Sequence, residues 1–367
     1  MKRLVALIAF LCATPAAAQS TDAIVRVVDI GAGLCAVISV PGGHGILFDA
    51  GPPGATNCQS AVRELVPGRR LDLVVLSHSD ADHIGMVRAI LGPQPSPNQA
   101  LRENDAAVII HPGDPRGVTV TRMRTTTLAE QAALGACVYD LRANNQPPPP
   151  CRVLSPGRAA AIAPGDSFPI GAGRATFVAG WGDGNLAFTA GDARIPNDAA
   201  RHNGLSIVIR FEYGGHSVLL TGDSLGRRQG DPANTCAYAE RIMRDRALAG
   251  TVAIDSDVLI AGHHGADNAS STCFIQAVSP RFVVFSAGNE YHHPRQATVT
   301  RLTDNGVALS DIFRTDLGDN EGGTEMTEGA GECADPTRDD DVEIRLPISP
   351  ASPVTVAYRG VSAPCGP

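Results

Sequence analysis

The sequence predicts an α/β fold in which ligand-type side chains gather at the ends of strands. Strand patterns dominate the first third of the chain, and strand and helix patterns alternate in the rest. The clearest strand is the apolar run 71–76, which has the composition of a fully buried strand. It ends directly in two histidines and two aspartates within residues 78–83. Because ligands bind at strand ends in α/β folds, this cluster marks the expected site.

The cluster has the composition of a metal site. Its members would repel one another unless a cation lay among them: His78, Asp80, Asp82 and His83. Neutral imidazoles and carboxylates are groups that divalent metals take as ligands. A solvated polar loop is the alternative, and the motifs further along the chain argue against it.

The other elements follow from short apolar runs separated by glycine and proline turns. Residues 23–30, 35–40 and 45–49 are joined by tight turns, which predicts an antiparallel start to a sheet. Further strands are expected at 106–111, 165–170, 174–179, 203–211, 216–223, 257–261, 282–286, 342–346 and 354–358. Helices are expected at 86–91, 128–134, 236–248 and 296–305.

Residues 1–18 have the pattern of a secretory signal peptide. Lys2 and Arg3 precede an apolar stretch that is too short to span a bilayer, and three alanines follow, ending at Ala18. We expect cleavage near Ala18 and a secreted or periplasmic chain without a membrane segment. Residues 19–367 are then expected to form one domain. A retained membrane anchor is the alternative.

The cysteine count fits export, because removal of Cys12 leaves an even number for disulfides. Proximity in the sequence favours the pairs Cys35–Cys58, Cys137–Cys151, Cys236–Cys273 and Cys333–Cys365.

The charge of the chain bears on its partners. The net charge is −8, and Lys2 is the only lysine, so the fixed positive charge after the leader is all arginine. An acidic surface disfavours a broad nucleic-acid interface but leaves a local arginine-lined groove open.

The motif His78-x-Asp80-x-Asp82-His83 resembles the metal motif of the metallo-β-lactamase superfamily. The superfamily usually has a second histidine where this chain has Asp80. The aspartate form is similar to the branch that includes the soluble domain of ComEC, a competence protein for DNA uptake. The resemblance spans roughly residues 25–316 and implies a four-layer αββα sandwich with the site at one sheet edge.

Further motifs in chain order carry the same resemblance. The superfamily's first motif matches Asp49-Ala-Gly51, and ComEC-like segments resemble Asn203-x-x-Ser206 and Thr221-Gly-Asp223. The last metal motif resembles Gly262-His263-His264-Gly265, and His293-Pro294 and Arg314-Thr-Asp316 also have counterparts. Residues 317–341, rich in glycine and acidic side chains, are expected to form a solvated inserted loop.

The resemblance implies a set of site residues. His78 and Asp80 would hold one divalent ion, Asp223 would bridge, and the other ion would be held by Asp82, His83 and His263. Asp49 and His264 are expected to support these ligands. One superfamily ligand position has no secure match, and His202 and Asn203 both remain candidates for it.

The expected chemistry is metal-assisted hydrolysis by one or two ions, with zinc or manganese as the metal. Asp82 is the candidate to orient the attacking water. His293 is the candidate to contact substrate or deliver a proton. A phosphodiester, in a nucleic acid or a smaller molecule, is the favoured substrate. The alternatives are a lactam, lactone or other small ester, and a non-catalytic metal-binding protein that retains the fold.

Overall fold

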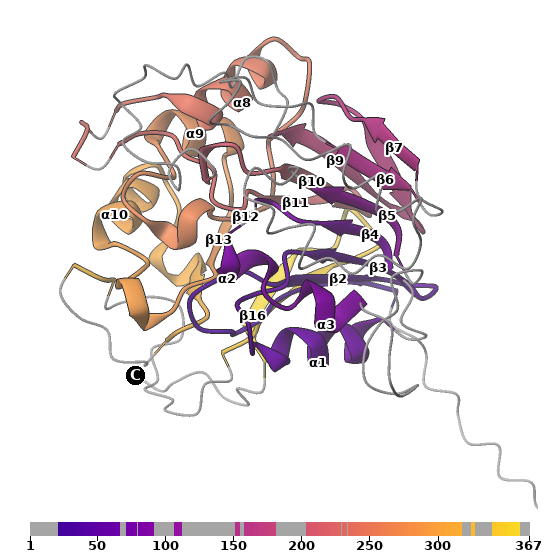
Figure 1. Cartoon of the computed structure of the whole chain (residues 1–367). Coiled ribbons are helices and arrows are strands. Elements are labelled where there is room, and N and C mark those ends of the chain that lie inside the picture. Colours follow the sequence, from indigo (N-terminus) through magenta and orange to yellow (C-terminus); the bar gives the residue numbers. More distant parts are fainter. Residues whose placement is uncertain are drawn as a thin grey trace, which may run out of the picture.

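The fold is taken from a computed structural model of the chain (Figure 1). The expected signal peptide, the expected helix 128–134, His202 and the side chains of Cys137, Cys151, Cys333 and Cys365 lie outside the described part of the structure. The described residues are 21–66, 71–78, 80–91, 106–111, 151–154, 158–180, 203–228, 230–232, 234–317, 324–326 and 340–359.

The first sheet contains nine described strands in the order β16-β15-β1-β2-β3-β4-β5-β6-β7. Strands β1, β2 and β3 are antiparallel to one another, whereas β3, β4 and β5 run parallel. The strands are β1 (Ala23–Val27), β2 (Ala36–Val40), β3 (His44–Phe48), β4 (Leu71–Val75), β5 (Ala106–His111), β6 (Cys151–Leu154), β7 (Arg158–Ala161), β15 (Val342–Leu346) and β16 (Thr355–Tyr358).

The second sheet contains seven described strands in the order β14-β13-β12-β11-β10-β9-β8. Strands β11 to β14 are parallel, so the carboxyl ends of these strands meet at one edge. The strands are β8 (Ser167–Ile170), β9 (Gly173–Ala179), β10 (Val208–Tyr213), β11 (His216–Leu220), β12 (Val258–Ile260), β13 (Phe282–Phe285) and β14 (Ile312–Arg314).

Side-chain alternation along the strands explains why the sheets stack into layers. In β2, Ile38 faces the large core between the two sheets, whereas Val37 packs on the helical side of the first sheet. The outer helices of the first sheet are α1 (Thr56–Leu65), α2 (Ala81–Ile84) and α3 (Val87–Leu91). Those of the second sheet are α8 (Tyr238–Leu248), α9 (Thr272–Val278) and α10 (Gln296–Asp304). The expected αββα sandwich is therefore confirmed (Figure 1).

Among the described residues, no helix has the length and apolar composition needed to span a bilayer. Two of the four expected disulfides are present, Cys35–Cys58 and Cys236–Cys273, with Cα–Cα distances of 6.0 and 5.8 Å. The first joins the start of β2 to α1 and closes a separation of 23 residues. It therefore holds a covering helix against the sheet that carries the His78 cluster.

Removal of this disulfide is expected to destabilise the chain without changing its fold. The double substitution Cys35→Ser and Cys58→Ser should lower the free energy of unfolding by about 2–4 kcal/mol, mainly because the unfolded chain gains freedom. Urea unfolding followed by circular dichroism measures the difference. An unchanged urea midpoint would show that the link contributes nothing to stability.

The acidic segment 317–341 is not wholly solvated, contrary to expectation. Glu325 and Met326 are buried, and Glu325 forms an ion pair with the buried guanidinium of Arg314, which also contacts Asp316 at 2.7 Å. A buried arginine needs carboxylate partners, and this segment supplies one of them. Met326 N donates to Pro294 O at 2.8 Å, so the segment lies beside the His293-Pro294 turn.

Candidate metal centre

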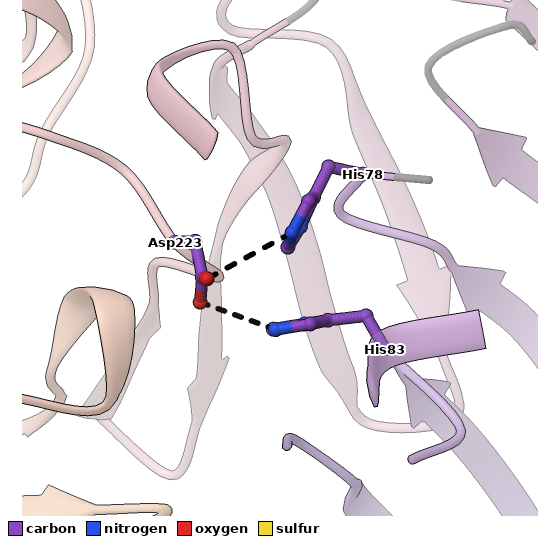
Figure 2. A group of neighbouring side chains, drawn as sticks. All are labelled: His78, His83 and Asp223. Atoms are coloured by element: carbon purple, nitrogen blue, oxygen red, sulfur yellow. Dashed lines mark ion pairs between the residues drawn. The ribbon is translucent and has the colours of Figure 1, made fainter. Parts of the chain in front are cut away.

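The predicted ligand residues converge where both sheets present strand ends. Ser77 and His78 follow β4, and α2 then carries Asp82 and His83. Asp223 follows β11, while His263 and His264 follow β12. Figure 2 shows His78 and His83 from the first sheet facing Asp223 from the second. Residues separated by more than 180 positions are thereby brought into one cluster.

Gly222 allows this close approach. Its φ is +53°, and a Cβ there would lie 2.6 Å from the Cβ of Ser77. Any other residue would therefore push the Asp223 turn away from the strand that carries His78. Ile207 N also donates to Ser77 O at 2.9 Å, which ties the two sheets together at the same point.

Asp223 lies at the centre of the cluster. Its Oδ1 is 3.2 Å from His83 Nε2 and 3.5 Å from His264 Nε2. Its Oδ2 is 3.8 Å from His78 Nε2 and 3.9 Å from His263 Nε2. The two oxygens of one carboxylate thus face two different pairs of histidines.

The hydrogen bonds of His83 and His264 determine where their ring protons lie. His83 Nδ1 is 2.7 Å from Asp49 Oδ2, and His264 Nδ1 is 2.7 Å from Ser286 O. Both partners can only accept, so each Nδ1 carries a hydrogen. The Nε2 atoms are therefore left to face each other at 3.3 Å and to face the Asp223 carboxylate.

Asp49 is completely buried and is placed to fix the loop that carries the ligands. Its carboxylate accepts from Ser77 N at 2.7 Å and from Ser77 Oγ at 2.6 Å, besides the bond to His83. Asp49 thus lies behind the cluster, in contact with Ser77 and His83. This arrangement orients an imidazole in the way that supporting carboxylates commonly do for metal ligands.

His264 occupies the position beside Asp82 and His83 that was expected for His263. His264, rather than His263, lies within 4.8 Å of both Asp82 and His83 through its ring nitrogen. Both residues have left-handed backbone, with φ of 50° and 56°, and their rings stand 6.3 Å apart. This turn directs the two rings to different oxygens of Asp223, which spacing in the sequence does not reveal.

His263 lies instead on the same side of Asp223 as His78, where both face Oδ2. Its Nε2 is 3.1 Å from Asn203 Nδ2, and its Nδ1 is 2.7 Å from Asn268 Oδ1. Asn203 is thus at the cluster, as one of the two candidates for the unmatched position. Asn268 was missed by the sequence reasoning, although an amide four residues after the histidine pair is visible in the sequence.

The two aspartates of the His78–His83 motif lie on different sides of the cluster. Asp80 Oδ2 is 3.7 Å from His78 Nε2. Asp82 Oδ2 is 3.8 Å from His83 Nε2 and 3.7 Å from His264 Nε2, and its side chain is one-third exposed. Asp82 therefore combines closeness to the histidines with access to solvent.

His293 lies outside the group of four histidines that face the Asp223 carboxylate. Its ring centroid is 6.1 Å from that of His263 and 6.3 Å from that of the exposed Tyr291. Burial and the nearby charge of His263 lower the pKa of His293 to about 3. The neutral ring fits a contact with substrate, whereas delivery of a proton from an imidazolium at neutral pH is disfavoured.

The buried charges show that the cluster requires positive charge. Burial raises the pKa of the Asp223 carboxyl, but the adjacent imidazoles of His83, His264 and His263 hold it well below its usual range. Burial lowers the pKa of His83, yet Asp223, Asp49 and Asp82 raise it well above its ordinary value. Without a metal, protons supply the charge that compensates these carboxylates.

His78 departs from this pattern. Burial and the charge of His83 lower its pKa. Within the described part of the chain, Nε2 of His78 and Oδ1 of Asp223 are buried without a hydrogen bond. A buried imidazole nitrogen with a free lone pair, facing a carboxylate, fits a metal ligand. Among the residues that the structure describes, two groups of ligand-type atoms lie close enough to hold an ion: His78, His83 and Asp223; and Asp82, His83 and His264.

The raised pKa of His83 gives a pH dependence for the metal-free protein. A folded pKa above the ordinary value of 6.5 stabilises the fold at pH below 6.5, and this contribution is lost as the pH rises through the folded pKa. We therefore expect the Tm of chelator-treated protein to fall as the pH rises above 6.5. Manganese or zinc should restore it, because deprotonated imidazoles bind metal. A metal-free Tm that stays constant or rises over this range would contradict the charge assignment.

Comparisons with known proteins extend the match beyond single motifs. The family model of the metallo-beta-lactamase superfamily matches residues 28–112. Competence protein ComA of Neisseria gonorrhoeae is 27% identical over 311 residues, which are 84% of this chain and 33% of that protein. ComE operon protein 3 of Bacillus subtilis strain 168 is 31% identical over 134 residues, which are 36% of this chain and 15% of that protein. The chain spans a third or less of these relatives.

Solved structures of low sequence identity are also similar to the chain. The metallo-beta-lactamase fold protein YhfI from Bacillus subtilis is 11% identical with a TM-score of 0.41, covering 83% of this chain and 98% of that one. A diphosphatase from the PhnP family is 12% identical with a TM-score of 0.39, covering 89% and 98%. The segment matched by the family model contains β4 and the whole His78–His83 motif. Residues 28–112 therefore resemble a domain of the metallo-beta-lactamase superfamily, and the chain is similar to competence protein ComA and to ComE operon protein 3.

Proposed function

We propose that the chain is a metal-dependent hydrolase that cleaves phosphodiesters at this cluster. One ion would be held by His78, Asp80 and Oδ2 of Asp223, with His263 and Asn203 beside it. The other would be held by Asp82, His83, His264 and Oδ1 of Asp223. The observation that carries the proposal is the convergence of the His83 and His264 Nε2 atoms, 3.3 Å apart, on a buried carboxylate.

Convergence of this kind supports an ion because both histidines already use Nδ1 as a donor. Two Nε2 lone pairs and a carboxylate that face one point repel one another in the absence of a positive charge. The alternative to an ion is a proton. The imidazole nitrogens and carboxylate oxygens of the cluster offer more lone pairs than one proton can bind. The donor set of imidazole and carboxylate fits zinc, and the aspartate at position 80 widens the choice to manganese.

When bound, a divalent ion polarises the bond under attack and makes water acidic enough to act near neutral pH. The chain's own residues have separate tasks. Asp82, whose carboxylate is partly exposed, would orient the attacking water. His293, whose ring lies beside that of His263, would contact the substrate. Asp49 holds the His83 ring in the required tautomer.

The phosphodiester preference is supported by the site and by the relatives. A site for two ions suits an in-line displacement, because each ion can stabilise one of the attacking and leaving oxygens. The chain is similar over most of its length to a competence protein. The net charge of −8 favours a small phosphodiester or a short strand over a long nucleic acid.

The test compares hydrolysis of bis-p-nitrophenyl phosphate by manganese- or zinc-loaded wild type and Asp82→Ala. Loss of the group that positions water should lower kcat by about 10²–10⁴-fold. Asp304→Ala, which changes an exposed carboxylate on α10, is the matched control and should keep the wild-type rate. Equal turnover by Asp82→Ala would exclude this site as the catalyst. Turnover of lactams or lactones but not of phosphodiesters would replace the proposed substrate class.

A further inference from the structure

The loop that carries His263 and His264 has a backbone that needs external support. Three non-glycine residues have positive φ within eight positions: His263, His264 and Ser270. Left-handed backbone at non-glycine residues is unfavourable and persists only where the surrounding contacts enforce it. The contacts that enforce it here come from buried charged residues outside the ligand cluster.

Arg301 of α10 makes most of these contacts. Its side chain is 5% exposed, and its guanidinium donates to the backbone oxygens of the loop: Asp267 O at 3.1 Å, Ala269 O at 2.9 Å and Ser270 O at 3.1 Å. It also donates to Asp267 Oδ1 at 2.7 Å and to Thr298 Oγ1 at 3.0 Å. One buried side chain thereby satisfies three backbone carbonyl groups of the loop that strands and helices leave unpaired.

Glu240 of α8 secures the end of the same loop from the opposite direction. This buried carboxylate accepts from Ser270 N at 2.6 Å and from Ser271 N at 2.7 Å. The loop therefore lies between a buried cation that binds its carbonyls and a buried anion that binds its N–H groups. Such a pairing fixes the path of the backbone more tightly than apolar packing does.

The loop residues that Arg301 and Glu240 hold are connected to the two histidines through Asp267 and Asn268. Asp267 Oδ1 is shared by Arg301 and by Arg227, which lies four residues beyond Asp223. Asn268 O accepts from the N–H groups of Gly226 and Arg227, both at 3.1 Å. Asn268 Oδ1 is 2.7 Å from His263 Nδ1. The position of His263 relative to Asp223 is thus set through Asp267 and Asn268.

We propose that Arg301 is a positioning residue of the metal centre, which acts by holding the loop 263–271 so that the two histidines face the two oxygens of Asp223. The proposal rests on the metal-binding function proposed above. Arginine is required because its fixed fork supplies five donors, whereas a lysine ammonium supplies three from a single point. The role is distinct from catalysis, because the contacts of Arg301 are to Asp267, Ala269, Ser270 and Thr298 and to none of the proposed ligand atoms.

The test uses the full chain with Arg301→Lys, which keeps the charge and loses the fork. The matched control is Arg210→Lys, another buried arginine that donates to a backbone oxygen, Asp255 O at 2.8 Å, and pairs with Glu212. Cobalt and zinc affinities are measured by competition with a chelator, together with the visible spectrum of bound cobalt. We expect Arg301→Lys to weaken metal binding about 10–100-fold and to alter the cobalt spectrum, as loss of supporting contacts does. Arg210→Lys should bind as wild type does.

A second variant covers the case in which Arg301→Lys does not fold. Asn268→Ala removes the last link to His263 and leaves the buried charges in place, and it should weaken metal binding to a similar extent. Folded Arg301→Lys and Asn268→Ala proteins with wild-type affinity and spectrum would overturn the proposal.

Imidazole NMR of the metal-free protein separates the two proposals. The hydrogen-bonded Nδ1 proton of His263 should give a slowly exchanging signal in wild type that is lost or shifted in Arg301→Lys. Wild type that binds no metal but shows this difference would refute the proposed function and keep the positioning role. Wild type that binds metal, with an unchanged His263 signal in Arg301→Lys, would refute the positioning role alone.

Discussion

Asp223→Asn is expected to reduce phosphodiester hydrolysis by roughly three orders of magnitude, which corresponds to about 4 kcal/mol of transition-state stabilisation. The carboxylate faces His83 and His264 with one oxygen and His78 and His263 with the other. An amide of the same shape keeps one oxygen, places a donor where the other oxygen stood, and removes the charge that the proposed ions share. Loss of an ion removes several kcal/mol of charge stabilisation.

The measurement pairs turnover of bis-p-nitrophenyl phosphate with metal content on the same sample. Asp257→Asn is the matched control, because Asp257 lies at the opposite end of the same sheet and accepts from Ser217 N at 2.8 Å. It should retain wild-type metal and rate. Asp223→Asn protein that keeps its full metal content and a rate within tenfold of wild type would contradict the bridging role.

Asp49→Asn is expected to weaken metal binding about 10–100-fold, although Asp49 does not face the cluster centre. The carboxylate accepts three bonds, from two Ser77 groups and from His83 Nδ1. An amide NH₂ cannot accept, so either Ser77 or His83 loses its partner, and His83 then favours the tautomer with hydrogen on Nε2. That tautomer has no lone pair for an ion on the cluster side.

The same substitution should lower the free energy of unfolding by about 1–3 kcal/mol, the cost of an unsatisfied buried group. Backbone strain does not complicate the comparison, because Asp49 has a φ of 56° and asparagine tolerates that region. Asp72→Asn is the control: Asp72 accepts from Gly45 N at 2.9 Å and pairs with His44 at 3.2 Å, in a similar arrangement near the surface. Equal metal affinities of Asp49→Asn and wild type would refute the supporting role of Asp49.

Much of the fold followed from local patterns. The mainly apolar runs of β2 and β4 placed these strands correctly, because both faces of each strand are covered and a strand buried on both faces needs apolar side chains on both. Helices α1 and α9 were missed. Helix α1 begins directly after a proline- and glycine-rich turn and has no side-chain cap, so its start carries no local signal.

The sequence likewise indicated some residues of the candidate site and not others. His78, Asp82 and His83 could be identified because they crowd into six residues at one strand end. His263 was favoured as the partner of Asp82 and His83, and the position of His264 beside them was not foreseen, since it depends on two consecutive left-handed residues whose strain is compensated by distant contacts. The buried position of Glu325 was also hidden, because it arises from Arg314, eleven residues earlier, rather than from its acidic neighbours.

Metal stoichiometry tests the central claim most directly. The chain is purified without chelator, incubated with manganese or zinc, freed of excess ions, and analysed by mass spectrometry against a sample carrying His83→Ala. The arrangement of histidines on both oxygens of Asp223 predicts about two ions per wild-type chain and a clear reduction in the variant. Wild-type protein that retains no metal at micromolar concentrations, or a variant that retains as much as wild type, would contradict the proposed metal centre.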